Sequence, residues 1–218
     1  MSDLSGERRV SMVNGQIRPN SMSDERVAQA MLAVPRELFV PKGLRGVAYV
    51  DEDIPVGNGR YLMEPRVLAR MLQAAEIEPD NVVLDVGCAT GYSTAVLARL
   101  AGSVVAIESD EELANRAQAL IAELSIDNAA VVVDPLADGY AEQAPYDVIL
   151  IGGAVEVVPS VLSEQLAEGG RMILVKRERG VGVAWLYRRD DGVVSGRELF
   201  DAQVMPLPGF ERPAEFVF

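Results

Sequence analysis

Short apolar runs alternate with helical patterns through the middle of the chain. Val82–Val86 is a β-branched run interrupted only by Asp85, which is typical of a buried parallel strand. A second apolar run ends at Glu108. Between the two runs, apolar residues recur at helical spacing, namely at Tyr92, Val96, Leu97 and Leu100. The order strand, helix, strand predicts a βαβ unit.

The residues before this unit carry helix boundary signals. Ser23 or Asp24 is expected to cap a helix that Pro35 ends, and Pro65 is expected to occupy the first position of another helix. Residues 36–64 are rich in proline and glycine, so we expect an ordered loop between these two helices.

Further alternation follows Glu108. Ser109 and Glu112 have capping-box spacing and predict a helix that extends to Leu124. Pro159 is expected to start a helix that Gly169-Gly170 ends. Three more short strands are predicted, at Ala130–Val133, Val148–Ile151 and Met172–Val175.

The last part of the chain has a different pattern. Val181–Tyr187 and Val193–Phe200 flank the turn sequence Asp190-Asp191-Gly192, which predicts a hairpin of antiparallel strands. Alternating strands and helices followed by a hairpin indicate an α/β fold, with a mostly parallel sheet and an antiparallel edge.

The turn after Val82–Val86 contains Gly87, Ala89 and Gly91. Such a turn brings backbone N–H groups and a helix N-terminus close to a ligand. Glu108 lies 21 residues after Gly87, where an acid binds the two hydroxyls of a ribose in βαβ units. The pattern predicts a site for a nucleoside-containing cofactor. The alternative is that the small residues only allow the strand and helix to pack closely.

The acid inside the first strand narrows the choice of cofactor. A dinucleotide site needs a third glycine, which is missing here, and the Asp85 carboxylate would repel a pyrophosphate. The same carboxylate suits the ammonium group of an amino-acid moiety. Asp85, the turn and Glu108 together point to S-adenosylmethionine.

Composition excludes several classes of function. The 218 residues include no histidine and one cysteine, which excludes a histidine-dependent triad, a histidine or zinc metal site and an internal disulfide. No metal is therefore expected. A cytoplasmic location is expected from the cysteine usage and from an N-terminus without an apolar signal core. No apolar run reaches the ~20 residues that span a membrane. The formal net charge of −13 opposes binding to nucleic acid or to an anionic membrane.

Seven phrases of the sequence are similar to those of one enzyme family. They are MVNGQI (12–17), DERVAQAMLAVPRELFVP (24–41), AYVDEDIPVGNG (48–59), VLDVGCATGY (83–92), AIE (106–108), APYDVIL (144–150) and LAEGGRM (166–172). With these phrases the chain resembles the protein-L-isoaspartate O-methyltransferases over roughly residues 12–176. VPRELFVP is the most specific phrase.

The resemblance implies the fold and the reaction. The fold would be that of a class I S-adenosylmethionine-dependent methyltransferase, which is Rossmann-like with seven strands. Residues 1–218 would form one domain with a substrate-side region (1–64), a cofactor-binding core (65–176) and C-terminal strands (177–218). The reaction would methylate the free carboxylate of an isoaspartyl residue in a damaged protein. A carboxylate is already anionic at pH 7, so this chemistry needs alignment and exclusion of water more than a general base.

The resemblance also implies roles for individual residues. Asp85, Gly87, Cys88, Ala89 and Gly91 would surround the methionine part of the cofactor, with Cys88 as a small filler, and Glu108 would bind the ribose. The family's adenine-binding acid aligns with Pro135, so either Asp134 would serve from a shifted position or the contact would be lost.

The substrate segment departs from the family pattern. After Gly59 the family has Gln-Thr-Ile-Ser-Gln-Pro, where this chain has Arg60-Tyr61-Leu62-Met63-Glu64-Pro65. Met63 replaces the serine implicated in catalysis and cannot donate a hydrogen bond. The family's Thr-Ala-Ala after the fourth strand is Gly152-Gly153-Ala154 here. We therefore place Arg60, Tyr61, Met63, Glu64 and Gly152 in the substrate pocket and leave the catalytic residue unassigned.

Two interpretations of Arg60 remain open. Its guanidinium is suited to anchor a substrate carboxylate in bidentate geometry. Alternatively, Arg60 pairs with a nearby acid such as Asp51, Asp53 or Glu64.

Three functions are compatible with this sequence. They are isoaspartyl repair with a rearranged pocket, methylation of a different acceptor, and non-catalytic binding of S-adenosylmethionine by a retained fold. The C-terminal Phe216-Val217-Phe218 fits either a strand that completes the sheet or a contact with a partner.

Overall fold

The computed structural model describes residues 4–20, 23–178 and 180–212. The C-terminal Phe216-Val217-Phe218, expected to form a strand or a partner contact, lies outside these residues. The helices are α1 (Leu4–Met12), α2 (Glu25–Ala33), α3 (Pro65–Ala74), α4 (Tyr92–Leu97), α5 (Glu111–Glu123) and α6 (Ser160–Glu164). A π-helical turn, Val13–Ile17, directly continues α1.

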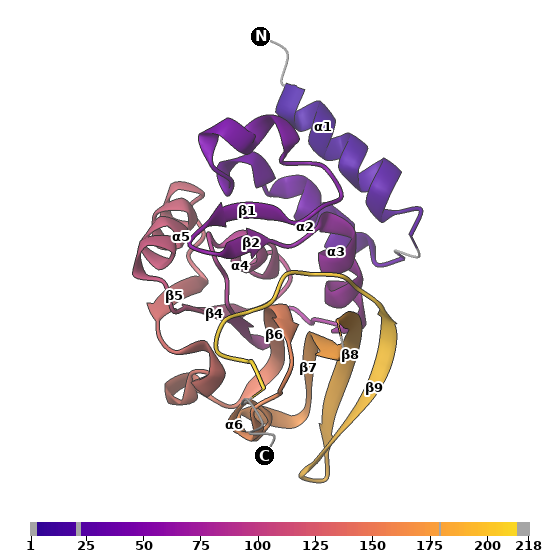
Figure 1. Cartoon of the computed structure of the whole chain (residues 1–218), viewed down its shortest axis with the longest axis vertical. Coiled ribbons are helices and arrows are strands. Elements are labelled where there is room, and N and C mark those ends of the chain that lie inside the picture. Colours follow the sequence, from indigo (N-terminus) through magenta and orange to yellow (C-terminus); the bar gives the residue numbers. More distant parts are fainter. Residues whose placement is uncertain (1–3, 21–22, 179, 213–218) are drawn as a thin grey trace, which may run out of the picture.

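A seven-stranded sheet forms the centre of the molecule (Figure 1). Its strands in spatial order are β5 (Ala129–Val133), β4 (Ser103–Glu108), β3 (Val82–Val86), β6 (Tyr146–Val155), β7 (Leu166–Glu178), β8 (Val181–Asp190) and β9 (Val193–Asp201). The first five are parallel, and β8 pairs antiparallel with both β7 and β9. The predicted α/β fold with a mostly parallel sheet and an antiparallel edge hairpin is confirmed.

The strand order creates a switch point at β3. The chain moves from β3 to β4 and β5 on one side, and then crosses back to β6 on the other side of β3. Ligands of open α/β sheets bind outside the carboxyl ends of strands at such a point. Asp85, near the end of β3, and Glu108, the last residue of β4, both lie at this edge.

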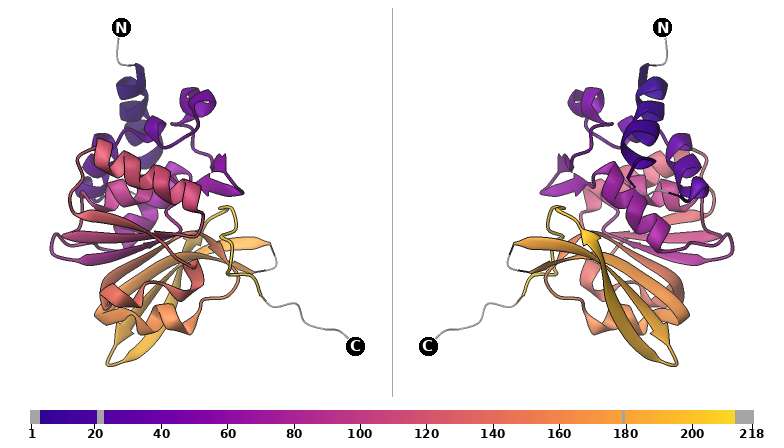
Figure 2. Two further views of the ribbon diagram at one scale, coloured as in Figure 1. Left: turned by 90° about the vertical axis from the view of Figure 1, so that its left-hand side faces the viewer. Right: turned by 90° about the vertical axis from the view of Figure 1, so that its right-hand side faces the viewer.

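Apolar side chains cover both faces of the sheet. Val83 belongs to one buried cluster and its neighbour Leu84 to another, as expected for a strand covered on both sides. The Figure 2 views show helices and loops above and below the sheet. Among the described helices, none combines the length and the apolar character that crossing a membrane requires.

Several predicted helix boundaries are correct. Asp24 caps α2 by accepting a hydrogen bond from the Arg26 N–H at 2.8 Å, and Pro65 is the first residue of α3. The predicted capping box of α5 is wrong by one residue. Asp110 is the cap, with a 2.9 Å bond from the Leu113 N–H, because the Ser109 N–H donates to Glu108 instead. Helix α6 ends at Glu164, well before Gly169-Gly170, which lie inside β7.

The segment 36–64 is more regular than the expected loop. It contains two 3₁₀ turns, Arg36–Leu38 and Lys42–Val47, and an antiparallel hairpin of β1 (Ile54–Gly57) and β2 (Arg60–Leu62). Asn58 and Gly59 form its turn with φ values of 51° and 72°, a left-handed pair that favours these two residue types. The hairpin lies against the carboxyl edge of the sheet (Figure 1), so it brings β2 to the predicted cofactor site.

Candidate active site at the carboxyl edge of the sheet

The turn between β3 and α4 has the backbone expected of a ligand cradle. Gly87, Ala89 and Gly91 all have positive φ, at 77°, 50° and 89°. Gly91 precedes the first residue of α4, and a Cβ there would lie 3.0 Å from the Ala117 Cβ on α5. Close packing of α4 against α5 therefore requires a glycine at this position.

Asp85 is a fully buried acid beneath this turn. Its Oδ2 accepts hydrogen bonds from the Ser93 and Thr94 hydroxyls of α4, both at 2.7 Å. Its Oδ1 has no hydrogen-bond partner among the described residues. Burial is the main cause that raises the pKa of Asp85 from its usual 3.8 to about 6, and the neighbouring Glu108 adds to this effect.

Glu108 is also fully buried, and it joins several elements. Its Oε1 accepts from the Ser109 N–H at 2.9 Å and from the Asp110 N–H at 3.2 Å. Its Oε2 accepts from the Ala89 N–H at 2.8 Å and from Arg60. The carboxylate thus links the end of β4, the turn after β3, the start of α5 and the hairpin.

Arg60 reaches this carboxylate from β2. Its Nη2 lies 3.0 Å from Glu108 Oε2 and donates to the Gly87 carbonyl oxygen at 2.9 Å. The expectation of an ion pair with Asp51, Asp53 or Glu64 was wrong about the partner. Asp51 pairs with Arg66, and Asp53 accepts from the backbone N–H groups of Glu64 and Met205.

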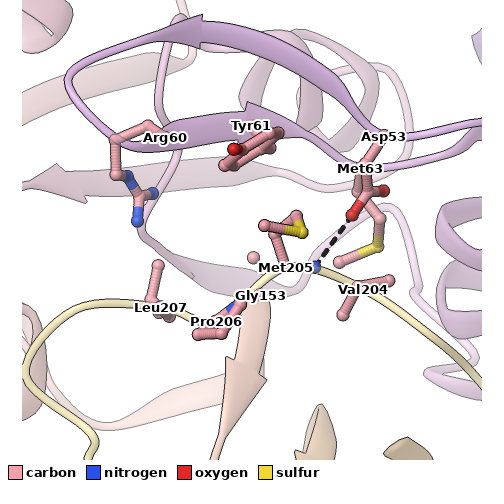
Figure 3. A pocket seen from close by; sticks show the side chains of 10 residues that line it. Asp53, Arg60, Tyr61, Met63, Gly153, Val204, Met205, Pro206 and Leu207 are labelled. Atoms are coloured by element: carbon pink, nitrogen blue, oxygen red, sulfur yellow. Dashed lines mark hydrogen bonds between the residues drawn. The ribbon is translucent and has the colours of Figure 1, made fainter.

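Four of the five residues assigned to the substrate pocket line one cavity. A cavity of about 10 Å³ between the hairpin and the segment Val204–Leu207 is lined by Arg60, Tyr61, Met63 and Gly152 (Figure 3). Glu64 follows Met63 but does not line this cavity; its side chain lies 3.6 Å from Arg66. Burial and the nearby Asp51 raise the pKa of Glu64.

Two further predicted residues lie at the ends of strands. Cys88 is buried in the turn, and this burial raises the pKa of its thiol well above the usual value, as suits a packing residue. Asp134 directly follows β5, and its N–H donates to the Glu108 carbonyl oxygen at 3.2 Å. Among the described residues, no cluster of three acid or cysteine side chains is placed to hold a metal ion.

The VPRELFVP phrase supports the turn from the other side. Arg36 is fully buried, donates to the carbonyl oxygens of Ala48 and Met63 at 2.7 and 2.8 Å, and lies 4.8 Å from the ring centroid of Tyr92. The Thr90 hydroxyl donates to the Phe39 carbonyl oxygen at 2.6 Å. This phrase therefore fixes both the turn and the end of β2.

Two contacts of the site were not predicted from the sequence. Asp53 Oδ2 accepts from the Met205 N–H at 2.8 Å and so joins the hairpin region to Val204–Leu207 (Figure 3). Leu207 packs onto the turn, because a Cβ on Gly87 would lie 2.7 Å from its Cδ1. No local pattern indicated either contact, since the partners are more than 100 residues apart in the chain.

The fit of S-adenosylmethionine to this site depends on the conformation described here. The cavities along the turn measure about 10 and about 20 Å³. A cavity of this size holds about one water molecule, whereas ligand pockets span roughly 300–1,000 Å³. The acids and the turn are of the right kind, but Arg60 and Leu207 fill the space above them. Binding of the cofactor therefore requires the Arg60 and Leu207 side chains to move.

Comparisons with known proteins agree on one family. The family model of protein-L-isoaspartate(D-aspartate) O-methyltransferase matches residues 7–211. A protein-L-isoaspartate O-methyltransferase of Koribacter versatilis is 39% identical over 201 residues, which are 92% of this chain and 90% of the relative. One from Roseiflexus castenholzii is 37% identical and covers 95% of this chain and 94% of its own length.

Solved structures support the same assignment. A protein-L-isoaspartate O-methyltransferase superposes with a TM-score of 0.81 and 26% identity, over 92% of this chain and 66% of that one. A structure from Plasmodium falciparum, solved in complex with S-adenosyl-L-homocysteine, superposes with a TM-score of 0.79 and 22% identity. The match covers 90% of this chain and 96% of that one, and it supports the fold. The chain belongs to the protein-L-isoaspartate O-methyltransferase family, whose members are S-adenosylmethionine-dependent methyltransferases.

Proposed function

We propose that this chain methylates the free carboxylate of isoaspartyl residues in damaged proteins, in the cytoplasm. The observation that carries the proposal is the convergence of two buried acids, Asp85 and Glu108, on one turn at the switch point of the sheet. Family membership supplies the reaction class.

The loss of stability caused by burying Asp85 supports a role for this residue in ligand binding. Asp85 is fully buried, one of its oxygens has no partner among the described residues, and its pKa is raised to about 6. A buried carboxylate with an unused acceptor reduces stability, so a scaffold alone gains nothing from it. We assign Asp85 to the amino-acid part of S-adenosylmethionine, Glu108 to its ribose, and Gly87, Cys88, Ala89 and Gly91 to the cradle around it.

The surroundings suit a carboxylate acceptor. S-adenosylmethionine, when bound, supplies an electrophilic methyl group on a sulfonium ion. An ionised carboxylate attacks such a group without a general base, which agrees with a chain that lacks histidine. The residues of this chain have to orient the acceptor and exclude water. Tyr61, Met63 and Gly152, which line the small cavity beside the turn, are assigned to that role.

A second candidate function rests on a separate observation. Met63 stands where the family has a serine, and it is 8% exposed at the edge of the closed cavity. This arrangement favours a chain that has kept the fold and lost transfer to isoaspartate. Substrate assays and substitution at Met63 separate the two functions.

Methyl transfer from labelled S-adenosylmethionine tests the proposed function directly. We expect label on a peptide that contains isoaspartate and none on the matched aspartyl peptide, measured as base-labile methanol. Label on neither peptide, with an active family member assayed in parallel, would rule out isoaspartyl transfer and leave the second candidate.

Replacing Met63 by serine tests the substrate pocket. The hydroxyl restores a donor to the acceptor carboxylate, and a hydrogen bond to a charged group contributes about 1.5–3 kcal/mol. We expect Met63→Ser to raise kcat/KM for the isoaspartyl peptide by about tenfold or more. Met63→Ala is the matched control, because it removes the same bulk without adding a donor. Equal rates for the two variants would contradict the assignment of this position.

Replacing Asp85 by asparagine tests whether the buried carboxylate lowers the stability of the fold while it contributes to cofactor binding. The folded protein holds the Asp85 proton more tightly than the unfolded chain does, because the pKa is raised from 3.8 to about 6. Stability therefore falls as the pH rises between these values, and the full penalty is present at pH 7.5. Each pKa unit corresponds to about 1.4 kcal/mol, so Asp85→Asn should be about 3 kcal/mol more stable than the wild type at pH 7.5.

Urea unfolding of both proteins at pH 4 and pH 7.5 measures this difference. The advantage of Asp85→Asn should fall to about 0.5 kcal/mol at pH 4, close to the unfolded pKa of 3.8. The same variant should bind S-adenosylhomocysteine more weakly than the wild type. A variant that is no more stable than the wild type at pH 7.5 would show that Asp85 carries no such penalty.

A further inference from the structure

Arg60 occupies the position on Glu108 that the proposed function assigns to the ribose. The carboxylate offers about four acceptor directions. Backbone N–H groups of Ala89, Ser109 and Asp110 use three of them, and Arg60 Nη2 uses the fourth at 3.0 Å. The Ser109 hydroxyl adds a longer contact of 3.4 Å to Oε1. A ribose hydroxyl therefore finds no free acceptor direction on Glu108 while Arg60 is bound there, and the departure of Arg60 frees one on Oε2.

A second element closes the same space. The segment Val204–Leu207, called the strap here, crosses the carboxyl ends of the central strands and places Leu207 over Gly87. Met205 O accepts from the Ala154 N–H at 2.9 Å, and the Leu207 N–H donates to Ala154 O at 2.8 Å. With the Asp53–Met205 hydrogen bond, the strap is held both by β6 and by the hairpin region (Figure 3).

The Arg60 contact is incomplete, which makes it suited to opening. A guanidinium usually binds a carboxylate with two parallel N–H bonds, but only Nη2 of Arg60 bonds Glu108. Arg60 Nε is buried and has no hydrogen-bond partner among the described residues. Moving Arg60 into water restores hydration to its Nε–H.

The site retains its shape when Arg60 leaves. Three backbone N–H groups continue to orient the Glu108 carboxylate, and the hairpin tip stays anchored because Asn58 Nδ2 donates to Asp110 Oδ2 at 2.8 Å. The turn itself is fixed by the bond from Thr90 to Phe39. Displacement of the Arg60 and Leu207 side chains removes the two groups that cover Gly87.

We propose that Arg60 and the strap form a latch that closes the cofactor site of the free protein, with the Arg60 guanidinium in the place of the ribose. This inference rests on the proposed function for the identity of the cofactor. When only a fraction of the protein is in the binding-competent state, the apparent Kd equals the intrinsic Kd divided by that fraction. A site that is open in one molecule in ten therefore has a tenfold higher Kd than a permanently open one.

Calorimetric titration with S-adenosylhomocysteine tests the latch on the full chain. We expect Arg60→Ala to bind at least tenfold more tightly than the wild type, because it removes the competitor. Leu207→Ala, which leaves the Arg60–Glu108 pair intact, should also bind more tightly. The control is Arg188→Ala, which removes an exposed arginine that is paired with Asp190 on β8 and should not change the Kd. Circular dichroism checks that each variant is folded.

The outcomes separate the latch from the proposed function. Arg60→Ala and Leu207→Ala that bind no more tightly than the wild type would overturn the latch, whatever the transfer assay gives. Tighter binding by both variants supports the latch even if no isoaspartyl peptide is methylated, because the titration does not depend on the acceptor.

Discussion

The Glu108 carboxylate is the interaction on which the site depends. It accepts hydrogen bonds from the turn after β3, from the two residues before α5 and from Arg60 on the hairpin. Burying a carboxylate costs less free energy when its acceptor directions are used. The same four contacts therefore hold the edge of the sheet together and decide whether a ligand has access to it.

This arrangement relates stability to function. With Arg60 in place, the Glu108 charge is compensated inside the protein, and Leu207 covers the turn at Gly87. An empty cofactor site would leave a buried acid partly unpaired and an apolar surface in contact with water. The latch avoids this loss of stability because Arg60 pairs with Glu108 and Leu207 covers the turn. The same contacts weaken cofactor binding, since the cofactor has to displace them. Asp85 is compensated only in part, because Ser93 and Thr94 donate to its Oδ2 while its Oδ1 has no partner among the described residues, and burial raises its pKa.

The fold was largely predictable because its signals are local. The β-branched runs, the small-residue turn, Pro65 and the Asp190-Asp191-Gly192 turn each act within a few residues, and all formed the expected elements. The β1–β2 hairpin also had a local signal, the Asn58-Gly59 pair between apolar strands, which the proline and glycine content around it obscured. The α5 cap was misplaced because Ser109 and Asp110 both suit that position, and the demands of Glu108 decide between them.

The candidate site was predictable in its residue types but not in its contacts. The motif phrases located Asp85, Glu108 and the turn, while the partner of Arg60 depends on how the hairpin docks on the sheet. The strap contacts join residues separated by 152 positions in the case of Asp53 and Met205. A repeating pattern of apolar residues gives no information about contacts between such distant positions. VPRELFVP is explained only by the buried contacts of Arg36 and Phe39, which hold Met63 and Thr90 in place.

A crystal structure of the full chain grown with saturating S-adenosylhomocysteine tests the central claim most directly. We expect a ribose hydroxyl on Glu108, with the Arg60 side chain displaced from the carboxylate and Leu207 moved off Gly87. S-adenosylhomocysteine bound in the chain while the Arg60–Glu108 pair stays intact would contradict it.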